Sequence, residues 1–142
     1  MPLSRDEDLR DVLTSARRFA MVGASAKPDR PSHGVMRFLL DRGWQVIPVN
    51  PGLAGQSILG QPVVASLAEI SPPVDMVDIF RSSDAAGAAV DEAIAHGARA
   101  VWLQLGVIDH AAAARAETAG LAVVMDHCPK IEIARLGISG PA

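Results

Sequence analysis

Residues 19–34 read F-A-M-V-G-A-S-A-K-P-D-R-P-S-H-G, and this stretch decides the fold class. The apolar run 19–22 has no polar alternation, which is typical of a strand buried on both faces of a sheet. The run stops at Gly23, and a helical pattern begins near Ser32. A buried strand, a short turn and a helix predict a right-handed crossover to a second, parallel strand.

The same alternation continues along the chain. We predict strands at 19–22, 46–49, 76–80, 100–103 and 121–125, and helices at 32–42, 84–96, 109–119 and 129–136. An amphipathic helix at 4–16 precedes them, residues 52–73 are irregular apart from a helical turn near 66–70, and 137–142 form a frayed tail. The pattern predicts an α/β fold, a single Rossmann-like three-layer domain spanning 1–142 with its core at 18–136. We expect about five parallel strands in the order 3-2-1-4-5.

Length and composition limit the class of protein. The chain has 142 residues, room for one domain but not for separate cofactor and substrate domains, and 49% of them are hydrophobic, enough for a substantial core. The net charge of −3 argues against nucleic-acid or membrane partners. Lys27, Arg30, His33 and Arg37 nevertheless cluster in one stretch opposed only by Asp29, which suits a small anionic ligand.

Cysteine and histidine usage adds two expectations. The single cysteine, Cys128, and the absence of a signal-peptide pattern or a long apolar run favour a cytoplasmic protein. The four histidines show no metal-ligand spacing with Cys128, so we expect no metal.

The turn after the first strand is the strongest candidate for a binding site, because ligands of open parallel sheets bind beyond the carboxyl ends of the strands. Gly23 lets the backbone approach a ligand, Ser25 offers a hydroxyl, and the helix beginning near Ser32 points free N–H groups at the site. Lys27 and Arg30 add positive charge, so the turn resembles a phosphate cradle. The plainer alternative is a tight turn, a helix cap and two solvated cations.

This turn departs from the dinucleotide-binding fingerprint. The pattern G-x-G-x-x-G is absent, since positions 25 and 28 are Ser and Pro and the next glycine is Gly34. Asn50 stands at the end of the second strand, where a ribose-binding acid is expected. Both departures argue against a conventional NAD dehydrogenase.

A series of motifs resembles the coenzyme A-binding domain family, the stand-alone relative of the nucleotide-binding domain of the succinyl-CoA synthetase alpha subunit. The motifs are F-A-M-V-G-A-S (19–25), P-S-H-G-V (31–35), V-I-P-V-N-P (46–51), V-D-I-F-R (77–81), A-V-W-L-Q-L-G (100–106) and V-M-D-H-C (124–128). Together they cover about 19–136. The resemblance implies a Rossmann-like fold that binds coenzyme A (CoA) or an acyl-CoA.

By this resemblance, the first turn and the start of the second helix meet the phosphates. The residues concerned are Gly23, Ala24 and Ser25, with Lys27 and Arg30 neutralising the 3′-phosphate or the pyrophosphate and Ser32 capping the helix. Independently of the resemblance, the place of His33 in the first turn of this helix makes it a candidate phosphate contact. Asn50 and Pro51 shape the pocket wall after the second strand.

Two further site residues follow later strands. Arg81 clamps a phosphate or an acyl carboxylate, or else pairs with Asp78 or Asp84, and relatives differ at this position. Gln104 binds the pantetheine amides, or else satisfies the loop backbone.

The residues favour a CoA-binding carrier, sensor or accessory protein with no catalytic residues of its own. One alternative is a small enzyme acting on an acyl-CoA or nucleotide through Arg81, His127 or Cys128, and another is an NAD(P)-binding regulatory domain. Cys128 is interpreted first as a packing residue, and secondly as a thiol able to pair with that of CoA. A second copy of the chain, or another protein, stays open as a partner.

Overall fold

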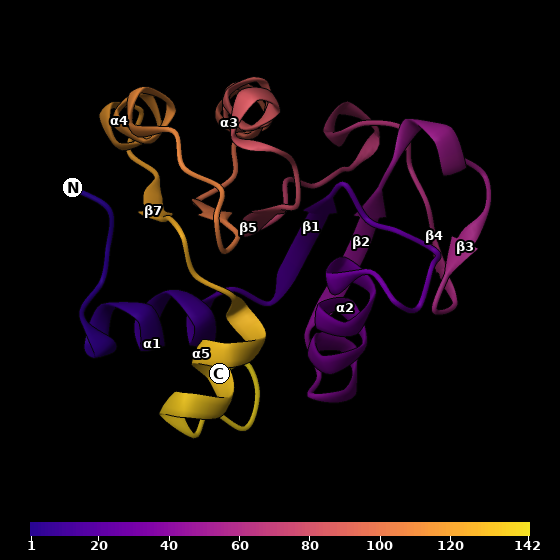
Figure 1. The fold of residues 1–142 in the computed structure, drawn as a ribbon, viewed down its shortest axis with the longest axis horizontal. Coiled ribbons are helices and arrows are strands. Elements are labelled where there is room, and N and C mark those ends of the chain that lie inside the picture. Colours follow the sequence, from indigo (N-terminus) through magenta and orange to yellow (C-terminus); the bar gives the residue numbers. More distant parts are fainter.

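A five-stranded parallel sheet forms the middle layer of the computed structural model, which describes residues 1–142 (Figure 1). The strands are β1 (Arg18–Val22), β2 (Gln45–Val49), β5 (Met76–Ile79), β6 (Ala100–Leu103) and β7 (Ala122–Val124). Their order across the sheet is β2-β1-β5-β6-β7. The α/β class and the five parallel strands predicted from the sequence are confirmed.

Helices cover both faces of this sheet, as Figure 1 shows. On one face lie α1 (Asp6–Ser15), α2 (Pro31–Asp41) and α5 (Pro129–Leu136), and on the other α3 (Ser83–His96) and α4 (His110–Thr118). The segment after β2 holds only short elements: η1 (Pro51–Leu53), β3 (Ser57–Ile58), β4 (Gln61–Pro62) and η2 (Leu67–Glu69). None of these helices combines the length and the apolarity needed to cross a bilayer.

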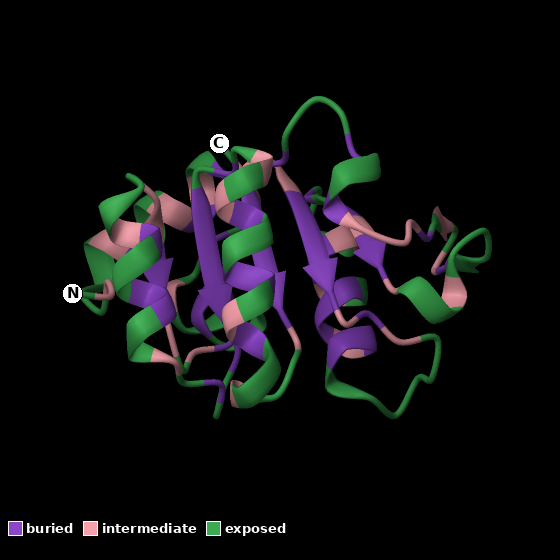
Figure 2. Ribbon diagram, turned by 90° about the horizontal axis from the view of Figure 1, so that it is seen from above, coloured by how far each residue is buried: buried purple, intermediate pink, exposed green.

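Each face of the sheet has its own apolar core. Along β1, Phe19 and Met21 enter the core beneath α1, α2 and α5, whereas Ala20 and Val22 enter the core beneath α3 and α4. Figure 2 shows the consequence, with buried strands at the centre and helices exposed on their outer sides. The uninterrupted apolar run is therefore explained by burial on both faces. The last residues also pack, because Ile138 is buried and Ala142 N–H donates to Thr14 O at 2.8 Å.

The sheet order differs from the expected 3-2-1-4-5 in one respect. Counted along the chain, the five strands lie in the order 2-1-3-4-5, because the third strand, β5, pairs with β1 and not with β2. The irregular segment lies beside β2 instead, where Val64 forms an isolated β-bridge with Val49. The switch in strand order therefore falls between β1 and β5.

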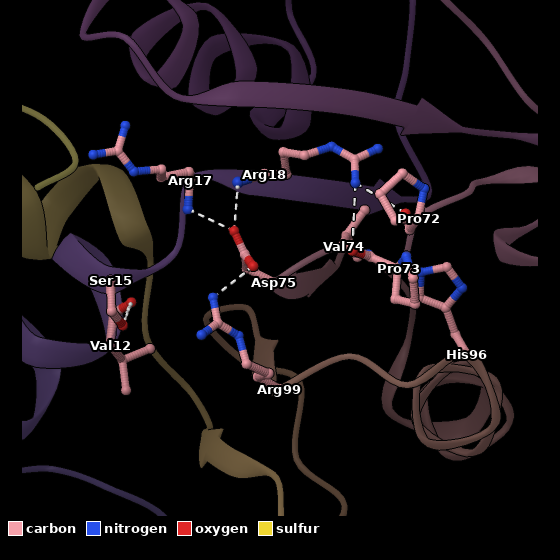
Figure 3. Close-up of polar contacts among 10 residues, drawn as sticks. All are labelled: Val12, Ser15, Arg17, Arg18, Pro72, Pro73, Val74, Asp75, His96 and Arg99. Carbon is pink, nitrogen blue, oxygen red and sulfur yellow. Dashed lines mark hydrogen bonds and ion pairs between the residues drawn. The ribbon is translucent and has the colours of Figure 1, made fainter.

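Asp75, directly before β5, holds the start of that strand beside the start of β1 (Figure 3). Its Oδ2 accepts hydrogen bonds from the backbone N–H groups of Arg17, at 2.8 Å, and Arg18, at 3.0 Å. Its Oδ1 pairs with Arg99 Nη2 at 2.6 Å, just before β6. Partial burial opposes ionisation of Asp75, but these hydrogen bonds outweigh it and lower the pKa of the carboxyl.

Asp78, in the middle of β5, is the most unusual core residue. Its cross-strand neighbours are Met21 and Trp102, it is fully buried, and neither carboxylate oxygen has a hydrogen-bond partner. Burial in this apolar layer raises the pKa of the Asp78 carboxyl well above its ordinary value. The folded state therefore favours the protonated form of Asp78 more than the unfolded state does.

We expect the free energy of unfolding to fall as the pH rises above the ordinary aspartate range toward this raised pKa, by up to about 1.4 kcal/mol per pH unit. Asp78→Asn removes the titration, so the variant should unfold at a higher temperature than the parent at pH 7.5, with a gap that narrows toward pH 4. Thermal unfolding over this pH range measures the effect. Asp11→Asn, at an exposed residue without an ion pair, is the control and should leave the slope unchanged. An identical pH slope in Asp78→Asn contradicts the assignment.

Candidate functional site

A cavity of about 1090 Å³ opens at the carboxyl edge of the sheet, across the switch in strand order between β1 and β5. Its wall is built from the turns that follow all five strands of the sheet. Nine predicted site residues line it: Gly23, Ala24, Ser25, Lys27, Arg30, Ser32, Asn50, Arg81 and Gln104. The cavity thus brings together residues that lie as much as 81 positions apart in the chain (23 to 104).

The turn after β1 presents unpaired backbone donors. The N–H groups of Ala24, Ser25 and Ala26 form no hydrogen bond within the protein. Ser25 shapes the turn, because its Oγ accepts a hydrogen bond from Lys27 N–H at 3.1 Å. Consecutive free N–H groups in a turn attract an anion.

Gly23 is required by the contact between β1 and β5. Its φ is +88°, in the region that favours glycine, and a Cβ at this position would lie 2.2 Å from Phe80 O. The turn therefore crosses the end of β5 with no space for a side chain. Gly23 and Phe80 both line the cavity.

The N-terminus of α2 faces the same cavity. Arg30 is the N-cap residue and makes no side-chain cap, Pro31 is the first helical residue, and no acidic residue lies in the first turn. The prediction that Ser32 caps the helix is wrong, because it is the second residue of α2. Ser32 is buried in the cavity wall, and its backbone N–H has no partner within the protein. The positive end of the helix dipole is therefore uncompensated by the chain.

The charges around the cavity have one sign. Lys27, Arg30, Arg81 and Lys130 line it, none of them forms an ion pair, and no Asp or Glu is among the lining residues. For a chain of net charge −3, this is a marked local excess of positive charge.

Asn50 holds two segments of the wall together. Its Nδ2 donates to Ala24 O at 2.8 Å, and its Oδ1 accepts from Gly52 N–H at 2.9 Å. These bonds tie the loop after β2 to the turn after β1. The side chain fixes the shape of the cavity and is already engaged by the protein.

Gln104 has no such partners. It is only 6% exposed, it lines the cavity, and its side chain takes part in no hydrogen bond, with Oε1 fully buried. A buried amide without a partner costs about 1–3 kcal/mol. The alternative prediction, that this side chain satisfies the loop backbone, is wrong.

The other predicted residues are placed as follows. His33 is buried within α2 and Pro51 is exposed at the start of η1, and neither is part of the cavity wall. The alternative role of Arg81, an ion pair with Asp78 or Asp84, is wrong because Asp78 is fully buried without a partner and Asp84 forms no ion pair.

Cys128 lines the cavity at its β7 end, together with Lys130 and Ile131. Its neighbours in sequence do not serve it as a base or an acid. Asp126 Oδ1 accepts from Gly106 N–H at 2.7 Å, and His127 Nδ1 lies 2.7 Å from Met125 O. The adjacency of these three residues therefore does not create a catalytic pair.

Apolar groups at the same end were not predicted from the sequence. Leu105 and Ile131 line the cavity although they are 55% and 51% exposed. The available signal was their position, since Leu105 is the second residue after β6 and Ile131 lies in the first turn of α5. From the sequence alone, apolar residues at such positions are usually assigned to the hydrophobic core.

The model of a protein family described as CoA binding domain matches residues 17–134. The chain is 36% identical over 124 residues to the uncharacterized protein YneT of Bacillus subtilis, covering 87% of this chain and 90% of YneT. A solved structure of a hypothetical protein from Pyrococcus horikoshii has a TM-score of 0.89 at 36% identity, covering 96% of both chains. A dinucleotide-forming acetyl-coenzyme A synthetase from Ca. Korarchaeum cryptofilum shares the fold, with a TM-score of 0.69 at 20% identity over 80% of this chain and 27% of the synthetase.

Gly23→Ala should lower the free energy of unfolding by about 2 kcal/mol or more, because the new Cβ meets the Phe80 carbonyl and the backbone must leave its present φ. Gly34→Ala is the matched control. There an added Cβ meets no atom within 4 Å, and replacing a helical glycine should raise stability by about 0.5–1 kcal/mol. Urea unfolding of the two variants measures both effects. Equal stability of Gly23→Ala and the parent contradicts the required close approach.

Proposed function

This chain belongs to the CoA binding domain family, and from that premise we propose that it binds coenzyme A or an acyl-CoA in the cavity at the carboxyl edge of its sheet. It acts as a carrier, sensor or accessory protein and not as an enzyme. The observation that carries the proposal is the composition of the cavity wall, with four cations and no carboxylate. Coenzyme A brings a pyrophosphate and a 3′-phosphate to match them.

The phosphates lie at the β1 end of the cavity. The free N–H groups of Ala24, Ser25 and Ala26 and the N-terminus of α2 bind phosphate oxygens there, and Lys27 and Arg30 supply formal charge. Both cations are exposed, so they adjust to the ligand without disturbing the core. Which phosphate each one meets follows from the pose of the ligand.

The pantetheine arm runs from this point along the carboxyl edge toward β6 and β7. Gln104 is the polar residue on that path, and its amide hydrogen-bonds an amide of the arm. Leu105 and Ile131 cover the apolar segments of the arm and lose their exposure when it binds. The unpaired amide and the exposed apolar side chains at this end of the cavity are thus complementary to the pantetheine arm.

The other two functions considered from the sequence receive no support from the geometry. A nicotinamide dinucleotide needs a carboxylate for its ribose diol, whereas Asn50 at that position is bound to Ala24 and Gly52. Catalysis on a thioester needs a general base beside the reacting group, and His127 is turned to its own backbone.

Lys27→Ala and Arg30→Ala should each weaken coenzyme A binding about tenfold or more, the loss expected for one charge-assisted contact to a phosphate. A cation that meets the 3′-phosphate or the 5′-α-phosphate should also be needed for binding of 3′,5′-ADP, which keeps these two phosphates and lacks the pantetheine arm. Arg37→Ala is the matched control, since it removes a cation of α2 that lies outside the cavity. Isothermal titration calorimetry with both ligands measures these constants, and thermal unfolding confirms that the variants are folded. A folded parent protein that binds neither ligand overturns the proposal.

Gln104→Leu tests the contact with the pantetheine end of the ligand separately from the contacts with its phosphates. It should weaken coenzyme A about tenfold through loss of the pantetheine hydrogen bond and leave 3′,5′-ADP binding unchanged. Because Gln104 has no hydrogen bond in the free protein, the variant should be at least as stable as the parent. Equal weakening of both ligands would place the pantetheine arm elsewhere.

A further inference from the structure

We propose that Cys128 forms a reversible mixed disulfide with coenzyme A, by exchange with a disulfide of coenzyme A brought into the cavity. The proposal rests on the proposed function and adds to it the residue that meets the thiol end of the ligand. It makes the chain a thiol-responsive holder of the coenzyme, able to retain it covalently when disulfides of coenzyme A accumulate.

The length of the ligand matches the width of the sheet. Three inter-strand steps separate β1, where the phosphates bind, from β7, which Cys128 follows, a distance of about 14 Å. The pantetheine arm has a backbone comparable to about four extended residues, which also reach roughly 14 Å. A coenzyme with its phosphates on the turn after β1 therefore carries its sulfur to Cys128.

Gln104 gives an independent reason to bring the arm this way. It stands after β6, between the phosphate end and Cys128, and its side chain is buried and without any hydrogen bond. An amide in this state requires a partner that the protein does not supply. An arm bound to it has only one more strand to cross before it reaches Cys128.

Cys128 lies at the N-terminus of α5, beside a cation of the cavity wall. The residue is the N-cap of α5, next to the unpaired N–H groups of the first turn, and its side chain makes no cap hydrogen bond. Lys130 lines the same part of the cavity, and Glu132, the one carboxylate of this turn, is paired with Arg135. Cys128 is only 6% exposed and lines the cavity, so we expect a disulfide bound in the cavity to reach it more readily than a disulfide in bulk solvent.

The exchange is balanced without a further reagent. The Cys128 thiolate attacks one sulfur of the coenzyme A disulfide, a new sulfur–sulfur bond forms, and the old one breaks. The second coenzyme A leaves as a thiolate and takes up a proton from water. The step needs no general base and no oxyanion donors, which agrees with a site where neither Asp126 nor His127 is free to assist.

Intact-mass spectrometry of the full, reduced chain incubated with coenzyme A disulfide tests the proposal. We expect a gain of one coenzyme A, lost again on reduction, and none in Cys128→Ser; no second cysteine confuses the assignment. The parent should react about tenfold or more faster with coenzyme A disulfide than with pantethine or glutathione disulfide at equal concentration, because only the first has phosphates to bind. Lys27→Ala should remove most of this preference and leave the glutathione rate unchanged.

Two results overturn the proposal. One is equal rates with all three disulfides, which means an accessible thiol without a site. The other is no adduct in a protein that binds coenzyme A by calorimetry. Calorimetry on folded Cys128→Ser keeps the two proposals apart, since retained binding without an adduct in the parent refutes only the disulfide. Absence of binding in both the parent and Cys128→Ser refutes the proposed function itself.

Discussion

The pairing of β1 with β5 is the constraint on which the rest of the structure depends. At the amino edge it is held by Asp75, which binds the backbone N–H groups of Arg17 and Arg18. At the carboxyl edge it brings Gly23 so close to Phe80 O that no side chain fits. This pairing sets the switch in strand order, and the switch is where the helices after β1 and β5 diverge to opposite faces and leave the cavity between them.

Stability and binding are divided between the two edges of the sheet. The amino edge carries satisfied groups, with a paired carboxylate on Asp75 and the Arg18 guanidinium donating to Pro72 O and Pro73 O (Figure 3). The carboxyl edge carries unsatisfied ones, such as the free N–H groups of the first turn and the amide of Gln104. Groups of the second kind destabilise a protein unless something binds them, so their concentration in one cavity is itself a sign of a ligand.

The sequence predicted the five parallel strands, because each is a short apolar run that ends at a turn residue. Most of the site was predictable too, since any residue after a parallel strand lies at the same edge. The place of β5 was not, because periodicity shows that a strand is buried but not which strand it pairs with. The roles of Asn50 and Arg81 needed coordinates for a similar reason: whether a side chain is engaged by the protein or free depends on contacts between distant segments. His33 lies on α2 but is buried in the protein, unlike its neighbour Ser32, which lines the cavity. The helical pattern alone did not decide which of the two positions faces the ligand.

The composition of the cavity predicts that a bound anion stabilises the folded protein. Four exposed cations line this cavity without a carboxylate among them, and the turn after β1 leaves backbone donors without a partner in the protein. A polyanion compensates both features, and because the unfolded chain has no such arrangement, its binding stabilises the folded state by an amount that rises with the ratio of free ligand concentration to Kd. In the proposed complex, a coenzyme with its phosphates at β1 and its arm on Gln104 at β6 has its sulfur placed by the spacing of the strands, so that one sheet governs both nucleotide binding and the position of the thiol.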